Sequence, residues 1–387
     1  MKLTDTSGNT IISVVDQFDY STQNQTYNDN FKKWRKDKDN PYAFNFELDR
    51  RESVFVEGKG FENRSASKAE RDCIGRVMNI IGIAMLMWIL IDNIISKLVI
   101  SVIDLLGFDL HTSFFSSGLY GGSVQVITAL IVISFVKVFV PAMYIHKKLR
   151  MPPRLEYMST LNHASDMLGT ICMTMAVSTV SCLPNIYTNR TMLVFNYFRS
   201  INADVNVWNQ NQFIVYIIFD IVIISVIYEL FFRGAVFNAL RQFGDIFAIV
   251  ITSAMSGLLV QDFRELPAAI LISAIASVGM LRSGTIITAI FVQICFKMYR
   301  LALVLLEDSS PDKIFLKRNT FMLVVFVIGA AGIMLIYLFK RKKHEHHIAE
   351  FTSKYSVNQR LAIACKSFPL PAIICLCLLA ALIKIFF

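Results

Sequence analysis

Among the ionisable residues inside or beside apolar segments of the sequence, four matter most for chemistry: Asp220, Glu229, Arg233 and Lys297. A charged side chain is costly in a membrane or in a protein interior, so each position indicates either a function or a paired partner. Glu229 and Arg233 are four residues apart, which places them on one helix face with the acid before the base, the favoured order. Such a pair can hold a carboxylate for acid–base chemistry, although the spacing alone favours a structural ion pair.

The segments that must position these residues are predicted membrane helices. Of 387 residues, 55% are hydrophobic and 17% are charged, against roughly 25% charged in soluble domains. The apolar residues come in long runs, and a helix of about 20 such residues crosses a bilayer core of about 30 Å. This excludes an ordinary soluble enzyme, a disordered chain and a disulfide-stapled secreted module. We expect an all-α, polytopic integral membrane protein with eight or nine transmembrane helices.

A polar region precedes the apolar part of the chain. Residues 1–72 have little apolar periodicity, and we expect a cytosolic, partly disordered region with a short helix near 65–76. Trp34 lies in a basic stretch that is typical of a solvated surface and, less often, of a membrane or partner contact. Residues 73–387 form the predicted transmembrane domain. Its candidate spans are 77–101, 123–145, 164–184, 213–232, 245–261, 266–281, 284–305, 320–339 and 367–386.

The basic residues favour a cytosolic N-terminus. No Lys or Arg occurs from 98 to 136, whereas the next loop, 147–154, carries four. Basic clusters beside apolar segments are typical of cytosolic loops that face anionic headgroups. We therefore expect a plasma-membrane protein in contact with lipid and without a nucleic-acid partner, despite the net charge of +9. The histidine cluster 344–347 follows the basic run 340–343, which favours a polar anchor over a metal site.

The residues around Glu229 resemble the first motif of the CPBP family, which comprises CAAX prenyl proteases and bacteriocin-processing or self-immunity (Abi) membrane proteins. Residues 228–234 read Tyr-Glu-Leu-Phe-Phe-Arg-Gly, similar to the family's Glu-Glu-x-x-x-Arg motif followed by Gly. The order and spacing of three helices within about 213–300 agree with the family. The resemblance implies a four-helix core at about 213–305 around a polar cavity, and an intramembrane glutamic protease with no cofactor and no metal.

The sequence departs from the family at most catalytic positions. In the family a Glu activates water, while His and Asn side chains orient it or stabilise the oxyanion. The first Glu of motif one is replaced here by Tyr228. The Phe and His of motif two are replaced by Ser256 and Val260, and the His and Asn of motif three by Gln293 and Lys297. The retained motif positions are Glu229 and Arg233.

These departures favour a protein without protease activity. Tyrosine, with a pKa of about 10, is a poor base at neutral pH, and Glu229 would have to act from a position about 100° of helix away. We expect an inactive homologue that binds peptide or membrane-protein segments as a scaffold, regulator or immunity factor. The alternative is an active intramembrane endopeptidase of CAAX-type or leader-type substrates that uses Glu229. A small-solute transporter is disfavoured, because no inverted repeat is evident.

Two further expectations concern the charges of the cavity. Lys297 is expected to pair with Glu229, the nearest acid that the family layout offers, and Arg233 to hold the same carboxylate. Asp220 precedes Glu229 by nine residues and falls on roughly the opposite helix face, so it is expected to face another helix rather than the same cavity. A shift of one residue along the second motif helix would place Gln261 at the His position.

Overall fold

The computed structural model describes most of the chain. The described residues are 3–4, 10–20, 24–48, 53–56, 60–63, 66–112, 119–156, 158, 164–181, 210–262, 265–308, 314–339, 355–367 and 369–386. Within them, six helices are long and apolar enough to cross a membrane, and one bent pair of helices would make a seventh span. The prediction of an all-α polytopic membrane protein is confirmed, whereas the predicted count of eight or nine spans is not.

The six spans match six of the segments expected from the sequence. They are Ser67–Leu105, Val124–Leu149, Ile214–Arg241, Leu266–Ser283, Ile286–Leu303 and Lys317–Ile336. The bent pair joins Val357–Cys365 and Pro369–Leu382. Two other expected spans form helices that fall outside the six. These are α7 (Ala164–Ser181) and the short α12 (Asp245–Leu258).

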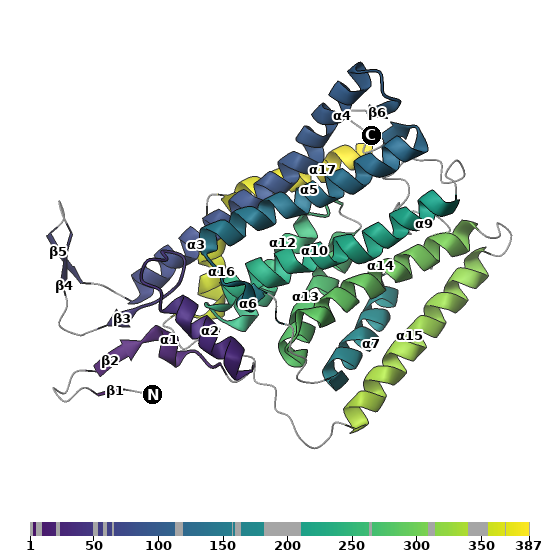
Figure 1. The fold of residues 1–387 in the computed structure, drawn as a ribbon. Helices are drawn as coiled ribbons and strands as arrows, with labels where there is room; N and C mark the ends of the chain where they lie inside the picture. Colours follow the sequence, from purple (N-terminus) through teal and green to yellow (C-terminus); the bar gives the residue numbers. More distant parts are fainter. Residues whose placement is uncertain are drawn as a thin grey trace.

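A long helical hairpin forms one side of the molecule (Figure 1). Its first arm continues from α3 through a π-helical segment into α4, and its second arm is α5. A short antiparallel strand pair, β6 with β7, lies between the two arms. The bounds are α3 Ala66–Leu90, η1 Ile91–Ile95, α4 Ser96–Leu105, β6 Leu110–Thr112, β7 Leu119–Gly121 and α5 Ser123–Leu149.

The next helix is interrupted by π-helical turns. In a π-turn the hydrogen bond runs from i to i+5, so the turn takes in one more residue than an α-turn and rotates every later side chain. Two such segments occur between residues 210 and 241. The elements are α9 Gln210–Ile218, η3 Phe219–Ile224, α10 Ser225–Glu229, η4 Leu230–Phe237 and α11 Asn238–Arg241.

A short helical hairpin, α12 and α13 (Leu266–Ser283), follows. The 14 residues of α12 span about 21 Å, less than a bilayer core of about 30 Å. Its end must therefore be shielded from lipid. Gln261 in the connection is buried with a φ of 53°, and its Oε1 accepts a hydrogen bond from Asn93 Nδ2 at 3.0 Å. The neighbouring helix η1 provides this shield.

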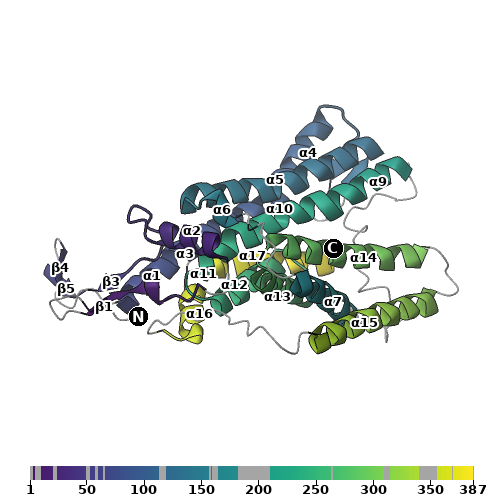
Figure 2. The same ribbon diagram turned by 60° about the horizontal axis from the view of Figure 1, so that its bottom comes forward.

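Helix α7 lies between α13, α14 (Ile286–Asp308) and α15 (Ile314–Phe339), as both views show (Figure 2). Glycines allow this close approach. A Cβ on Gly329 would lie 2.7 Å from the Cys172 carbonyl oxygen and 2.8 Å from the Ala176 nitrogen. Small residues at helix contacts are the usual means of tight packing between membrane helices.

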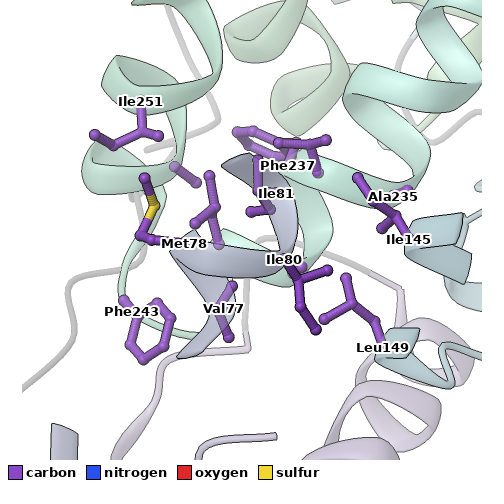
Figure 3. Packing of buried hydrophobic residues seen from close by; sticks show 14 of the residues in the cluster. Val77, Met78, Ile80, Ile81, Ile145, Leu149, Ala235, Phe237, Phe243 and Ile251 are labelled. Carbon is purple, nitrogen blue, oxygen red and sulfur yellow. The ribbon is translucent and has the colours of Figure 1, made fainter. Parts of the chain in front are cut away.

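The main hydrophobic core joins the long hairpin to the central helices (Figure 3). Side chains of α3 meet those of α5, η4 and α12, and also Phe243 in the turn before α12. Those labelled are Val77, Met78, Ile80, Ile81, Ile145, Leu149, Ala235, Phe237, Phe243 and Ile251. This core fixes η4, which carries Arg233, relative to α3 and α5.

The last two helices pack against α3. Helix α16 (Val357–Cys365) begins with a capping box formed by Ser356 and Gln359. Arg360 Nε donates to Glu70 Oε1 at 2.7 Å, and its Nη1 donates to the Phe243 carbonyl at 2.8 Å, all in buried surroundings. Helix α17 (Pro369–Phe386) then runs beside α3.

Part of the polar N-terminal region folds against one end of the bundle. Helix α2 (Gln25–Arg35) is capped by Asn24, whose Oδ1 accepts from the Tyr27 backbone N–H at 2.7 Å. The N-terminal region also forms antiparallel strands. Strands β1 (Leu3–Thr4), β2 (Thr10–Ser13) and β3 (Glu47–Leu48) make one sheet, and β4 (Ser53–Val56) pairs with β5 (Gly60–Asn63) in a hairpin. Two single-turn helices complete the described elements: α1 Val14–Gln17 and α6 Pro153–Glu156.

Trp34 is not a surface residue, and the expectation of a solvated or membrane contact is wrong. It is 4% exposed, and its Nε1 donates to the Leu149 carbonyl at the end of α5 at 3.0 Å. Tyr27 Oη donates to Asn238 Oδ1 at 2.9 Å, and the Phe44 N–H donates to Gln242 Oε1 at 2.6 Å. Residues 24–46 are therefore a cap that ties the ends of α5 and α11 together.

Candidate functional site

The substituted motif positions meet in one cavity. Its volume is about 200 Å³, and Val260 in the connection after α12 lines it. Elements α3, α5, η3, α10, α12, α13 and α14 contribute to its walls. All five substituted positions line it: Tyr228, Ser256, Val260, Gln293 and Lys297. The sequence therefore identified positions that share one site.

The side-chain hydroxyls of Tyr228 and Ser256 are hydrogen-bonded to each other. Their hydroxyl oxygens are 2.6 Å apart, and either can be the donor. The Tyr228 ring also packs edge-on against Trp88 of α3, with ring centroids 6.0 Å apart. The positions that correspond to the family's first Glu and to its motif-two Phe are thus joined by a neutral hydrogen bond. Val260 contributes only an apolar surface beside them.

Lys297 pairs with Asp220, and the expected pairing with Glu229 is wrong. Its Nζ donates to the Asp220 backbone carbonyl at 2.8 Å and lies 3.3 Å from the Asp220 carboxylate. Nine α-helical residues would place Asp220 about 180° from Glu229, but one extra residue in the η3 turn reduces this angle to about 80°. Asp220 therefore faces another helix, α14, as expected, but it also lines the same cavity as Tyr228 and Lys297, which was not expected.

Glu229 and Arg233 form a separate, fully buried pair. Arg233 Nη1 lies 3.2 Å from Glu229 Oε1 and 3.1 Å from Oε2. Arg233 Nη2 donates to the Ser273 carbonyl at 2.6 Å and to its hydroxyl at 2.7 Å, which ties η4 to α13. Neither Glu229 nor Arg233 is among the residues that line the cavity. The retained motif residues thus join helices beside the cavity.

Two more ion pairs belong to the site, and the sequence analysis did not predict them. Lys137 Nζ of α5 lies 3.0 Å from Asp92 of η1, and Arg300 Nη2 of α14 lies 2.8 Å from Glu265. Lys137, Arg300 and Glu265 line the cavity together with the Lys297 pair. The signal was present, because Asp92 and Lys137 each lie inside an expected apolar span.

The cavity lies near the middle of the apolar spans. Lys137 is close to the midpoint of Val124–Leu149, and Tyr228 is close to the midpoint of Ile214–Arg241. Lys297 follows the start of α14 at Ile286 by about 16 Å of helix. Any group that reaches these side chains must therefore enter the membrane interior.

The described residues contain no group of three or more His, Cys, Asp or Glu side chains that could hold a metal ion. The histidine cluster 344–347 lies outside the described residues. The ionisable groups of the cavity instead form cation–carboxylate pairs. Such an arrangement can bind polar groups by hydrogen bonding and charge.

A comparison with known protein families matches the part of the chain that forms most of this site. Residues 210–299 match the family model described as type II CAAX prenyl endopeptidase Rce1-like. The chain therefore carries an Rce1-like CAAX-protease segment within a membrane-helical protein, and the resemblance to the CPBP family is confirmed for these residues. No curated protein and no solved structure matches the chain. The matched segment spans α9 to α14, the elements that supply most of the cavity wall.

Proposed function

We propose that this protein is a catalytically inactive CAAX-protease-like membrane protein that binds a peptide or membrane-protein segment without cutting it. One observation carries the proposal. The only carboxylate retained from the family's motif, Glu229, is held by Arg233 outside the cavity lining, while the lining positions are Tyr228, Val260 and Lys297. A base that activates water must come within about 2.6–3.2 Å of it, directly or through one water.

The other groups of the cavity do not replace the missing chemistry. Hydrolysis also needs preorganised donors at the developing oxyanion, and loss of one such donor lowers the rate by roughly 10²–10³. Lys297 is engaged with Asp220, and the hydroxyls of Tyr228 and Ser256 are engaged with each other. Gln293 remains as a neutral donor in the lining. This set supports binding of a polar group and does not support activation of water.

The class of role that follows is scaffold, regulator or immunity factor for a partner within the plasma membrane. The basic residues at 147–154 support a cytosolic position for that loop. The N-terminal cap contacts the end of α5 that leads into this loop, so the same argument supports a cytosolic N-terminus. A partner segment would then be held between cytosolic cap contacts and the mid-membrane cavity.

The test combines cleavage and binding in lipid nanodiscs. Farnesylated CAAX peptides and leader-type peptides are incubated with the wild-type protein, Glu229→Gln and Arg233→Ala, and products are followed by mass spectrometry. In parallel, retention of each intact peptide on the immobilised nanodiscs is measured. We expect retained, uncut peptide with the wild-type protein. A shortened product that disappears in Glu229→Gln would overturn the proposal and assign the protein to the active endopeptidases.

A further inference from the structure

The charges around the cavity are unequal in number. Three cations line it, Lys137, Lys297 and Arg300, but only two carboxylates do, Asp220 and Glu265. The third carboxylate, Asp92, neutralises Lys137 from outside the lining. Among the described residues, the lining itself therefore presents one cation more than it presents carboxylates.

The lining side chains also have more hydrogen-bond donors than they use in hydrogen bonds to other described residues. An ammonium group has three donors, and Lys137 Nζ makes one hydrogen bond within the described part of the chain, to Asp92. Among these residues, Ser134, Gln293 and the Trp88 indole N–H make no hydrogen bond, yet all three residues line the cavity. The lining thus offers several donors that have no acceptor among the described residues.

The size of the cavity and its depth in the membrane limit which chemical group can supply a hydrogen-bond acceptor to these donors. A cavity of about 200 Å³ is smaller than pockets that enclose drug-sized ligands, which run from about 300 to 1,000 Å³. It has room for a side chain, not for a helix. Its position near the midpoints of the spans also lies too deep for the phosphates of the lipid headgroups, which border a core about 30 Å thick.

We infer that the segment bound by this protein is a membrane-spanning helix that carries a carboxylate side chain, Asp or Glu, near the middle of its span. The inference rests on the proposed function and specifies its partner. The carboxylate accepts from Lys137 and from the Gln293 amide, and Trp88 and Ser134 supply further donors. A carboxylate is the side chain that accepts several hydrogen bonds without needing to donate one, which fits this lining.

Lys137 is the principal contact, because its position allows a second partner. It is on α5, and its side chain is 25% exposed, against 13% for Lys297 and 12% for Arg300. Lys297 already donates to both the backbone and the side chain of Asp220. An acid on a partner helix would share Lys137 with Asp92 and leave the other two pairs intact.

The probe is a set of synthetic leucine-rich spanning peptides that differ at one position. They carry Glu, Gln or Lys at the centre, or Glu six residues towards one end. Binding to the full-length protein in nanodiscs is measured by energy transfer between a labelled peptide and the labelled protein. A charge-assisted hydrogen bond contributes about tenfold or more to affinity. We therefore expect the central-Glu peptide to bind at least about tenfold more tightly than the other three.

Two variants test the assignment of Lys137. Lys137→Met should remove most of the preference for Glu over Gln, and Lys137→Met/Asp92→Asn keeps the membrane interior neutral in case the single variant does not fold. Lys97→Met, a lysine of α4 that does not line the cavity, is the matched control and should retain the preference. Retention of the preference in the folded double variant would overturn the role of Lys137.

The remaining outcomes separate the inference from the proposed function. Equal binding of the Glu and Gln peptides, or tighter binding of the Lys peptide, overturns the inference and leaves segment binding itself supported. Binding of none of the leucine-rich peptides, together with retention of a CAAX or leader-type peptide, overturns the inference and leaves the proposed function supported. Retention of no peptide of either kind overturns both. A preference for central Glu supports the inference.

Discussion

Lys297 and Asp220 give a direct test of how the core helices are joined. Their side chains are 13% and 16% exposed, and the ammonium group also donates to the Asp220 carbonyl at 2.8 Å. Lys297→Met leaves the carboxylate in the membrane interior without its cation. Removal of one partner from a buried pair costs about 3–5 kcal/mol, because the remaining charge is uncompensated. We expect Lys297→Met to lower the unfolding temperature by several degrees.

A double variant shows whether the stability lost in Lys297→Met comes from its ion pair with Asp220. In Lys297→Met/Asp220→Asn no charge remains, and replacing both members of a buried pair is often close to neutral. The double variant should therefore be more stable than Lys297→Met alone. We expect a coupling energy of about 1–3 kcal/mol, the upper part of the range for residues in direct contact. Thermal unfolding in nanodiscs, followed by intrinsic fluorescence, gives the four values of the cycle.

A second cycle provides the control. Lys297→Met combined with Glu229→Gln tests the pairing that was expected from the family layout. Since Glu229 is paired with Arg233 and Lys297 with Asp220, the coupling between these two changes should be smaller than the coupling of Lys297 with Asp220. A strong coupling of Lys297 to Glu229, with none to Asp220, would refute the arrangement of the π-helical turn and the geometry of the cavity with it.

Burial raises the pKa of Tyr27 above its ordinary value of 10.0. The folded protein then keeps a proton that the unfolded chain releases, so stability falls as the pH rises above about 10. Tyr27→Phe should reduce this loss in thermal unfolding across about pH 8–11, and Tyr120→Phe, at an exposed position, should not. Gly329→Ala should cost about 1–3 kcal/mol, because its Cβ would lie 2.7 Å from the Cys172 carbonyl oxygen. Gly75→Ala, with open space around its Cβ, should be neutral or stabilising by up to about 1 kcal/mol. Equal unfolding temperatures for the two glycine variants would contradict the packing of α7 on α15.

The sequence predicted the helical class and the five substituted motif positions that line the cavity, because these depend on apolar runs and on the family's motifs. It did not predict the partner of Lys297. That partner depends on η3, where an extra residue in the turn rotates Asp220 towards the cavity. A π-turn has no strong sequence signal, since its residues are those of an ordinary membrane helix. An ideal period applied across residues 219–224 therefore gives the wrong face.

The N-terminal cap was missed for a different reason. Composition identifies residues 1–72 as polar, and a low average hydrophobicity hides a short helix with one apolar face. Tyr27, Phe31 and Trp34 are spaced i, i+4 and i+7, which is the spacing of one helical face, and all three are buried. Asn24 stands at the N-cap position before them. A search for short amphipathic patterns would have found this helix, but not the helix ends against which it packs.

The cavity keeps a polar lining although five of the family's motif positions are substituted in it, and this combination itself needs a physical reason. A buried ion pair is often no more stable than apolar residues of the same volume, and three such pairs surround this cavity within the membrane spans. Apolar packing would have closed the site at no cost in stability. Structural pairing explains Glu229 and Arg233, which join η4 to α13 and lie outside the lining. It does not explain Ser134, Gln293 and the Trp88 N–H, which contribute no hydrogen bond among the described residues. A polar ligand explains both the open volume and these donors.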